Sequence, residues 1–211
     1  MKSRMLPLAG SVLAAALACA APARAATALF DFENQPIFTE TPFTMSAAGV
    51  SATFSGPADV DPGAFGISSN YQTPTGFTYR LMSVDFLTVG SAFGASGSTL
   101  TISFDRPVTG FSVDFALDDP DHLSTLSFST NAAGAASSMG ALTPGFRYPE
   151  GTLSFSGAAF TVLTVRSDAI DFQLDNLRIT TAVPEPTDLL LLGAGLPVIA
   201  WARRRAGARK S

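Results

Sequence analysis

Several residues that carry catalysis and metal binding are almost absent from this chain of 211 residues. It has one cysteine, Cys19, one histidine, His122, and one tryptophan, Trp201. Zinc sites need several Cys or His ligands, and a serine hydrolase here would depend on the single histidine. No nucleophile elbow, phosphate-binding glycine loop or internal repeat is present either. The sequence therefore favours a protein that is not an enzyme.

Basic residues are scarce in the central part of the chain, between Ala26 and Ala182. This part has five arginines, no lysine and 15 acidic residues, so its net charge is −10, although the whole chain carries −4. Lysine-dependent chemistry is thereby excluded, and a large negative charge repels polyanions. We expect no nucleic-acid partner, whereas export and divalent cations are compatible with this charge.

The N-terminal end has the layout of a secretory signal peptide. Lys2 and Arg4 precede an apolar stretch from Met5 to Ala18, and small residues then occupy the −3 and −1 positions of a cleavage site. Residues 1–25 are therefore predicted to form a signal helix that is removed, so that the mature chain begins at about Ala26.

A lipoprotein signal is the alternative, with Cys19 as the lipidated first residue. The leucine before this cysteine lies one place away from its usual position, so we favour simple cleavage. Cleavage also removes the only cysteine, and no disulfide is then expected in the mature protein.

Three consecutive segments distinguish the C-terminal end. The first is a hinge, Val183, Pro184, Glu185 and Pro186, whose prolines fix the backbone and remove two hydrogen-bond donors. The second is the apolar run from Leu189 to Ala202, which as a helix reaches roughly 21 Å, against about 30 Å for a hydrocarbon core. The third is the basic cluster Arg203, Arg204 and Arg205, which favours the cytoplasmic side and stops transfer. Together they predict an apolar C-terminal helix at a membrane.

Residues 183–206 resemble the PEP-CTERM sorting signal of Gram-negative bacteria, with the motif, the apolar span and the arginines in the same order. The resemblance implies an exosortase as partner, processing near the Pro-Glu-Pro, and a precursor anchored in the inner membrane by its C-terminal helix. It also implies a final place at the cell surface or in the extracellular matrix, with exopolysaccharide and biofilm. Pro197 and the basic tail at 207–211 depart from the pattern. An ordinary tail anchor or a buried C-terminal helix is the alternative.

The part between, residues 26–182, shows strand-like alternation. Leu100, Ile102 and Phe104 share one face of a predicted strand, and the apolar residues from Phe111 to Leu117 share one face of the next. Between them Asp105-Arg106-Pro107 predicts a hairpin turn. Similar runs recur at 29–33, 50–55, 84–89, 123–129, 152–156, 159–165 and 170–180, separated by turn residues. We predict an all-β fold, an antiparallel β-sandwich of the jelly-roll type.

Acidic residues on the first and last predicted strands suggest a metal site. Asp31 and Glu33 lie on the first strand and Asp175 on the last, and these two segments resemble the opening and closing strands of carbohydrate-binding-module jelly rolls. That resemblance implies a structural calcium held by these three side chains, since Ca²⁺ prefers oxygen ligands. The alternative is that they are outward strand residues and a bend cap. The acidic turns at 59–63 and 118–122 lack the spacing of a calcium loop.

Two of the three tyrosines, Tyr71 and Tyr79, flank a short loop and are candidates for a platform on which a sugar ring stacks. The alternative is packing at the rim of a sheet.

As a whole, the sequence predicts an exported exosortase substrate. Its β-domain is then a calcium-dependent carbohydrate-binding module or a structural matrix protein; a glycoside-cleaving enzyme would need two facing carboxylates, among Glu33, Glu40 and Glu150.

Overall fold

A computed structural model describes residues 25–56, 65–73, 76–90, 98–118 and 124–182. All regular structure in these residues is β-strand and the pairing is antiparallel, which confirms the predicted fold class. Residues 26–182 form one compact unit. The predicted signal helix, the sorting motif, the apolar helix and the arginine cluster lie outside the described residues. Within the described ranges no helix has the length and hydropathy needed to cross a bilayer.

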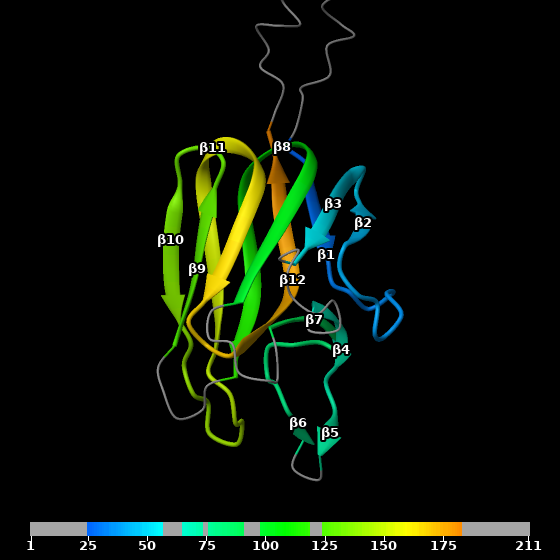
Figure 1. Ribbon diagram of the computed structural model, residues 1–211, viewed down its shortest axis with the longest axis vertical. Helices are drawn as coiled ribbons and strands as arrows, with labels where there is room; N and C mark the ends of the chain where they lie inside the picture. Colours follow the sequence, from blue (N-terminus) through cyan, green and yellow to red (C-terminus); the bar gives the residue numbers. More distant parts are fainter. Residues whose placement is uncertain (1–24, 57–64, 74–75, 91–97, 119–123, 183–211) are drawn as a thin grey trace, which may run out of the picture. The chain divides into compact units, whose positions relative to one another are not determined.

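The strands form two layers (Figure 1). The elements are β1 (Thr27–Phe30), β2 (Phe43–Ala47), β3 (Val50–Ser55), β4 (Phe65–Ser69), β5 (Gln72–Thr73), β6 (Gly76–Phe77), β7 (Asp85–Gly90), β8 (Ser98–Leu117), β9 (Thr125–Thr130), β10 (Ala135–Met139), β11 (Glu150–Ser167) and β12 (Asp171–Thr181). One layer has the order β10-β9-β11-β8-β3-β2 and the other β11-β8-β12-β7-β4, with β1 beside β12. Strands β8 and β11 thus belong to both layers.

The long strands β8 and β11 bend together from one layer into the other. Residues 98–103 of β8 pair with 162–167 of β11, and 110–116 pair with 150–156, with register shifts between the two ladders. The predicted hairpin at 105–107 is therefore wrong, because β8 continues through it and its halves do not pair with each other. Irregular registers bend a strand, and such bends let strands turn the corner between packed sheets. At this bend the backbone N–H of Ser51 donates to Asp105 Oδ1 at 3.0 Å.

Phenylalanine fills the space between the layers, as the alternation predicted. Phe54 of β3 makes edge contacts with Phe30 and Phe32, and Phe111 of β8 does the same with Phe128 of β9 across the core. Side chains such as these are almost fully buried. Each buries on the order of 150 to 250 Å², so core packing accounts for most of the aromatic content.

The first and last strands pair with each other. Thr27 lies opposite Thr180, the N–H of Thr181 donates to the Ala26 carbonyl at 2.9 Å, and the N–H of Ala182 donates to the Pro107 carbonyl at 3.1 Å. Both ends of residues 26–182 therefore emerge side by side, next to the bend of β8.

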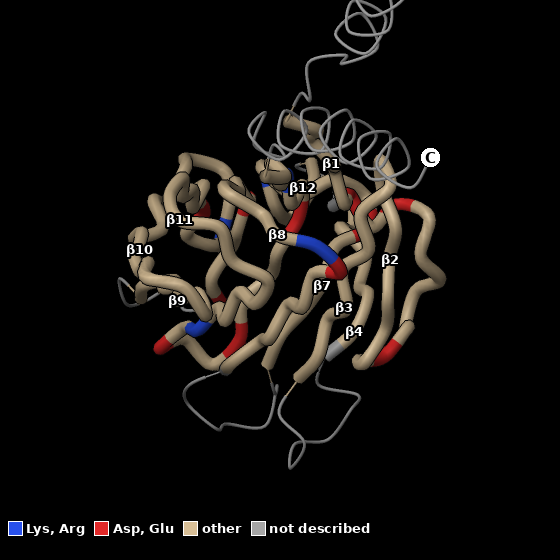
Figure 2. Tube along the Cα trace, turned by 90° about the horizontal axis from the view of Figure 1, so that it is seen from above, with Lys and Arg blue, Asp and Glu red and all other residues tan. Residues whose placement is uncertain are grey.

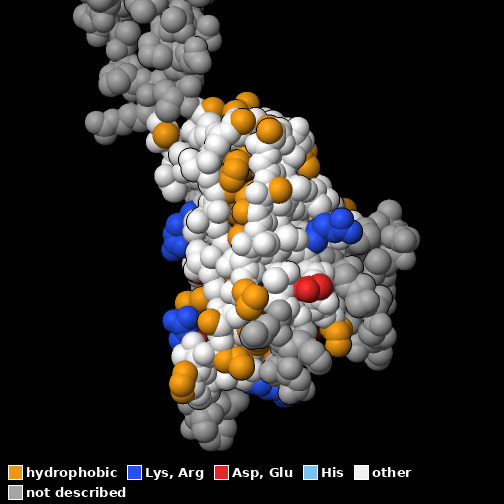
Figure 3. All heavy atoms as spheres, turned by 90° about the vertical axis from the view of Figure 1, so that its left-hand side faces the viewer, with side chains coloured by type: hydrophobic (Ala, Val, Ile, Leu, Met, Phe, Trp, Pro, Cys, Tyr) orange, Lys and Arg blue, Asp and Glu red, His pale blue; other side chains and the backbone are white. Residues whose placement is uncertain are grey.

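The edge strand β10 was not predicted, because it is built from alanine, serine and methionine and has no apolar alternation. The face on its side of the molecule shows scattered apolar side chains and only isolated charges (Figure 3). Strands β2 and β4 and the short pair β5–β6 were also missed, while β3 begins and ends at the predicted residues.

Candidate functional site

A short segment between β6 and β7 covers the outer face of the layer that contains β12. We call residues 79–85 the strap. Its backbone N–H groups point at three carboxylates: those of Arg80 and Leu81 donate to Glu150 Oε1 at 2.6 and 3.3 Å, and that of Ser83 donates to Asp175 Oδ2 at 2.6 Å. The N–H groups at 84 and 85 donate to Glu33 Oε1 at 2.8 and 3.2 Å. Glu33 and Asp31 do not lie on the first strand as predicted, because β1 ends at Phe30 and Glu33 is in the turn that follows. Carboxylates from this turn, β11 and β12 thus hold five strap amides.

Asp175 is the most deeply buried of these acids, with no exposed surface. Besides the Ser83 amide it accepts a bond from Ser83 Oγ at 2.6 Å, and the N–H of Asn176 donates to its Oδ1 at 2.6 Å. Burial raises the pKa of Asp175 to about 6, against the lowering effect of these donors, and the charge of Glu33 adds to the increase. Asn176 has a left-handed φ of 52°, at a bulge in the register between β12 and β8. This bulge returns Leu177 to the core side while Asp175 faces the strap.

Asn70 holds the strap from its N-terminal side. Its Nδ2 donates to the carbonyls of Tyr79 and Met82, both at 3.1 Å, and its Oδ1 accepts the N–H of Tyr79 at 3.1 Å. The side chain is almost fully buried and satisfied. Asn70 therefore binds both the N–H and the carbonyl of Tyr79, and this fixes the position of the tyrosine.

The structure brings two of the three predicted calcium ligands together. Glu33 and Asp175 both bind the strap and interact electrostatically, whereas Asp31 has no role in holding it. Among the described residues no three Asp, Glu, His or Cys side chains converge as a metal-ligating group. Because backbone and serine donors already take the oxygens of Asp175, the arrangement fits a carboxylate that holds protein better than one that holds Ca²⁺.

One titration tests the calcium site that the sequence predicts at Asp31, Glu33 and Asp175 against the hydrogen bonds that the structure shows around Asp175. Because Asp175 is already satisfied, we expect saturating calcium to change the melting temperature of the mature protein by less than about 1 °C. Differential scanning calorimetry with and without chelator measures this. A clear rise that Glu33→Gln abolishes would instead establish the calcium site.

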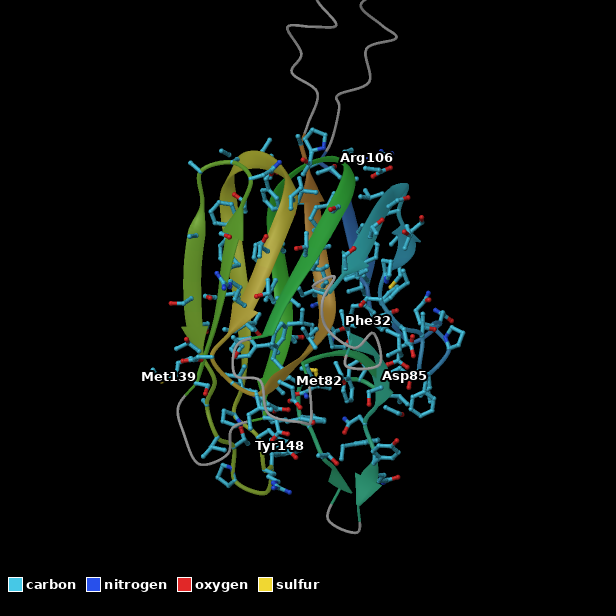
Figure 4. The ribbon with its side chains drawn as sticks, in the orientation of Figure 1. Phe32, Met82, Asp85, Arg106, Met139 and Tyr148 are labelled. Atoms are coloured by element: carbon cyan, nitrogen blue, oxygen red, sulfur yellow. The ribbon has the colours of Figure 1, made fainter. Side chains whose placement is uncertain are left out.

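The predicted platform of Tyr71 and Tyr79 has a different composition in the structure. Tyr79 stacks on Tyr148, with ring centroids 5.1 Å apart and planes at 23°, and it forms a T-shaped contact with Phe86, with the centroids 5.2 Å apart. Tyr71 is 67% exposed and has no recorded ring partner among the described residues. The guanidinium of Arg147 lies 5.4 Å from the centroid of the Tyr148 ring. The aromatic feature at this end of the sandwich is thus the Tyr79–Tyr148 pair (Figure 4).

Carboxylates surround this aromatic pair. Burial raises the pKa of the Tyr79 hydroxyl, and the charges of Asp171, Asp118 and Glu150 add to the effect. Burial likewise raises the pKa of Asp171 to about 6, although Gln173 Nε2 donates to its Oδ1 at 3.0 Å. Acidic side chains therefore lie near the tyrosine rings, together with the positive charge of Arg147 beside Tyr148, in a chain that has more acidic than basic residues (Figure 2).

Two buried oxygens near this pair accept no hydrogen bond. Gln173 Oε1 is one, and Glu150 Oε2 is the other, 3.6 Å from Arg80 Nε. Both residues lie opposite Ala116 of β8, Glu150 on one side and Gln173 on the other, so they share one row of the sheet. Gln173 is 3% exposed and Glu150 2%. Buried acceptors without donors are uncommon. Here both oxygens are enclosed by protein, and Glu150 Oε2 has Arg80 as an ion-pair partner.

Sequence reasoning missed Tyr148, Asp171 and Gln173 as members of this site. One signal was available: in β12 polar residues at 171, 173 and 175 alternate with Phe172 and Leu174. Because β12 is central in its layer, such polar residues need a cover on the outer face. Only the tertiary structure shows that the strap is the segment that covers this face.

Comparisons with known proteins find solved structures of similar fold but no family. No family model matches this chain, and no curated protein matches it significantly. The K2 cleaved adhesin domain of Lys-gingipain matches with a TM-score of 0.49 and 15% identity over 74% of this chain and 99% of that chain. The K1 cleaved adhesin domain of Lys-gingipain from Porphyromonas gingivalis W83 matches with a TM-score of 0.46 and 12% identity, over 74% of this chain and 99% of that chain.

A further similar structure is TmCBM61 in complex with β-1,4-galactotriose, with a TM-score of 0.35 and 10% identity over 71% of this chain and 97% of that chain. At these identities and scores the likenesses assign neither a family nor a ligand to this protein. Its candidate site is therefore defined by its own geometry: a stacked tyrosine pair, one ring of which, Tyr79, belongs to a strap that carboxylates hold.

Proposed function

We propose that this chain is an exported exosortase substrate whose β-sandwich is displayed at the cell surface or in the matrix. There it binds exopolysaccharide through the Tyr79–Tyr148 end. The supporting observation is the position of the two ends of residues 26–182. They leave the sandwich side by side at the bend of β8, near Arg106, whereas Tyr148 lies at the opposite end of the sandwich (Figure 4).

This arrangement suits a domain that is attached through its C-terminal side. A membrane-bound tail that follows Ala182 would be joined to the sandwich at the end that carries the β8 bend, which is opposite the tyrosine end. The signal peptidase site before Ala26 would lie on the same attached side, so both processing steps would leave the tyrosine end untouched.

The chemistry at the tyrosine end favours binding over catalysis. Stacked aromatic rings beside hydrogen-bonding groups are typical of sites that orient a ligand without changing it. The carboxylates there are engaged with protein donors: Glu150 with the strap and Asp171 with Gln173. A structural matrix role without a ligand is the alternative.

Processing is tested by the mass of the mature protein from cells with and without the exosortase. We expect the N-terminus at about Ala26 in both, a C-terminus near Pro186 in the wild-type cells, and a retained tail in cells that lack the enzyme. The matched control is Glu185→Ala with both prolines kept, which should also retain the tail. A C-terminus at Ser211 in both strains would contradict the proposal.

A further inference from the structure

We infer that the turn formed by residues 36–39 docks into a second protein, one that presents an apolar pocket surrounded by basic residues. The turn lies between β1 and β2 and projects from the side of the sandwich, next to β4 (Figure 1). Three features of the turn support this contact: its strained backbone, its rigid attachment to β4 and the charge of its neighbours. Polysaccharide binding at the tyrosine end is not required for it.

The backbone of the turn is strained at Phe38. The N–H of Thr39 donates to the carbonyl of Pro36 at 3.0 Å, so residues 36–39 form a β-turn with Ile37 and Phe38 at its centre. Phe38, the third residue, has a left-handed φ of 68°. A positive φ at this position is typical of a type II turn, which favours Gly or Asn there, and a bulky side chain makes it costly. The fold alone would therefore favour glycine at position 38.

Burial does not compensate for this strain. Phe32 has a similar φ of 62°, but it is fully buried and packs edge-on against Phe54 with ring centroids 5.4 Å apart. Phe38 is 81% exposed, and its neighbours Ile37 and Pro36 are exposed as well. Three consecutive exposed apolar residues are unfavourable unless they have a function, and backbone strain is often retained where a chain holds a ligand. A contact outside the chain accounts for both the strain and the exposed ring.

The turn is fixed in place without a partner. The N–H of Phe38 donates to the carbonyl of Ile67 at 2.9 Å, and the N–H of Ile67 donates to the carbonyl of Thr39 at 3.1 Å. Thr39 Oγ1 also donates to the carbonyl of Pro36 at 2.7 Å. Gly66 permits this close approach, since a Cβ atom there would lie 2.8 Å from the Thr39 carbonyl oxygen. A rigid element loses little conformational entropy on binding, and an aromatic ring held in this way suits a concave apolar pocket.

The charge around the turn indicates what surrounds that pocket. Residues 31–42 contain no basic residue and three acidic ones, Asp31, Glu33 and Glu40. Glu40 is exposed, and because it is two residues from Phe38 their Cα atoms are at most about 7 Å apart. Together with the net charge of −10 over residues 26–182, this disfavours a second copy of the chain and an anionic membrane. It favours a protein that carries Lys or Arg around the pocket.

Phe38→Gly separates the needs of the fold from those of the contact. Because glycine adopts a positive φ without strain, the melting temperature of the mature protein should rise by about 1 to 4 °C. Differential scanning calorimetry measures this change. A decrease would show that the Phe38 side chain serves the fold, and it would overturn the inference.

Photochemical crosslinking tests the contact in cells that make the full chain with benzoylphenylalanine at position 38. Irradiation should give a protease-sensitive adduct, and mass spectrometry should place the link in an apolar segment that has Lys or Arg beside it. Glu40→Lys should lower the yield at least about fivefold. With benzoylphenylalanine at position 37 instead, Phe38→Gly should abolish the adduct. The matched control has the photoreactive group in place of Tyr71, which is 67% exposed, and should not give this adduct.

Several outcomes of the crosslinking would overturn the inference. Two of them are the absence of an adduct at position 38 and an adduct of equal yield at position 71. An adduct with a second copy of the chain, a lipid or a polysaccharide would show that a different occupant covers the turn. A protein adduct that Glu40→Lys strengthens would place acidic residues around the pocket and would contradict the inference as well.

Discussion

Replacing Asp175 with alanine should lower the free energy of unfolding by about 2 to 5 kcal/mol at neutral pH. The change leaves three partly buried donors without an acceptor: the N–H and Oγ of Ser83 and the N–H of Asn176. Each unsatisfied buried donor costs about 1 to 3 kcal/mol. Against this, removal of a buried charge whose pKa is raised to about 6 returns at most about 3 kcal/mol. The lost donors outweigh the relief.

Asp171→Ala is the matched control, because the two acids share their burial and their raised pKa and differ in the number of donors. Asp171 accepts one side-chain bond, from Gln173 Nε2, and its pKa is also raised to about 6. For Asp171→Ala, the free energy gained by removing a buried charge is as large as the cost of leaving one donor without an acceptor. The free energy of unfolding should therefore change by less than about 1 kcal/mol.

Urea unfolding followed by circular dichroism measures both variants, since the only tryptophan lies in the tail. Proteolysis adds a local readout: Asp175→Ala should expose the strap to cleavage, whereas Asp171→Ala should not. Equal destabilisation by the two variants would mean that burial of the charge, and not the number of donors, decides their contribution. The strap would then not depend on Asp175.

Much of the fold could be predicted from local sequence. Alternation of large apolar residues located β3, both halves of β8 and most of β11 and β12, because side chains in a strand point alternately to the two faces. The bend of β8 could not be predicted, since Asp105-Arg106-Pro107 is equally suited to a hairpin turn. What decides between them is the partner strand β11, which bends at the same level and keeps pairing on both sides.

The candidate site was predicted in part and for a different role. Asp175 lies on the last strand as predicted, whereas Glu33 lies in the turn after the first strand, and pairing of these two strands brings both acids to one region. Their oxygens, however, are directed at the amides of the strap. Sequence patterns reveal that a carboxylate is present, but its partner is a backbone N–H some 50 to 90 residues away, which leaves no signature in the sequence.

Tyr79 illustrates the same limit. Its nearest tyrosine in the sequence, Tyr71, suggested a platform across a short loop. The ring is instead stacked on Tyr148, which follows β10 and lies beside Pro149 and Glu150 at the start of β11. Glu150 also holds the strap through the amides of Arg80 and Leu81, which directly follow Tyr79. These two hydrogen bonds therefore bring Glu150 close to the aromatic pair. The platform therefore depends on the strap being in place.

The same buried acids predict an unusual dependence of stability on pH. An aspartate in the unfolded chain has a pKa of about 3.9, whereas burial raises those of Asp171 and Asp175 to about 6. Between these values the folded protein binds more protons than the unfolded chain, so the free energy of unfolding falls as the pH rises. The stabilising contribution is complete below about pH 4 and is lost as the pH passes through about 6.

Burial raises the pKa of Glu150 as well, which acts in the same direction, while the lowered pKa of exposed Asp105 acts weakly in the opposite one. We expect the urea midpoint of the mature protein to decrease between about pH 4.5 and 7. Over this range the free energy of unfolding should fall by about 2 to 4 kcal/mol. Asp171→Asn removes one titrating group and should reduce the slope by roughly half, whereas Glu40→Gln, at an exposed site, should leave it unchanged. A stability that rises across this range in the wild type would show that the donors around these carboxylates outweigh their desolvation, and that the strap is held most firmly when Asp175 is ionised.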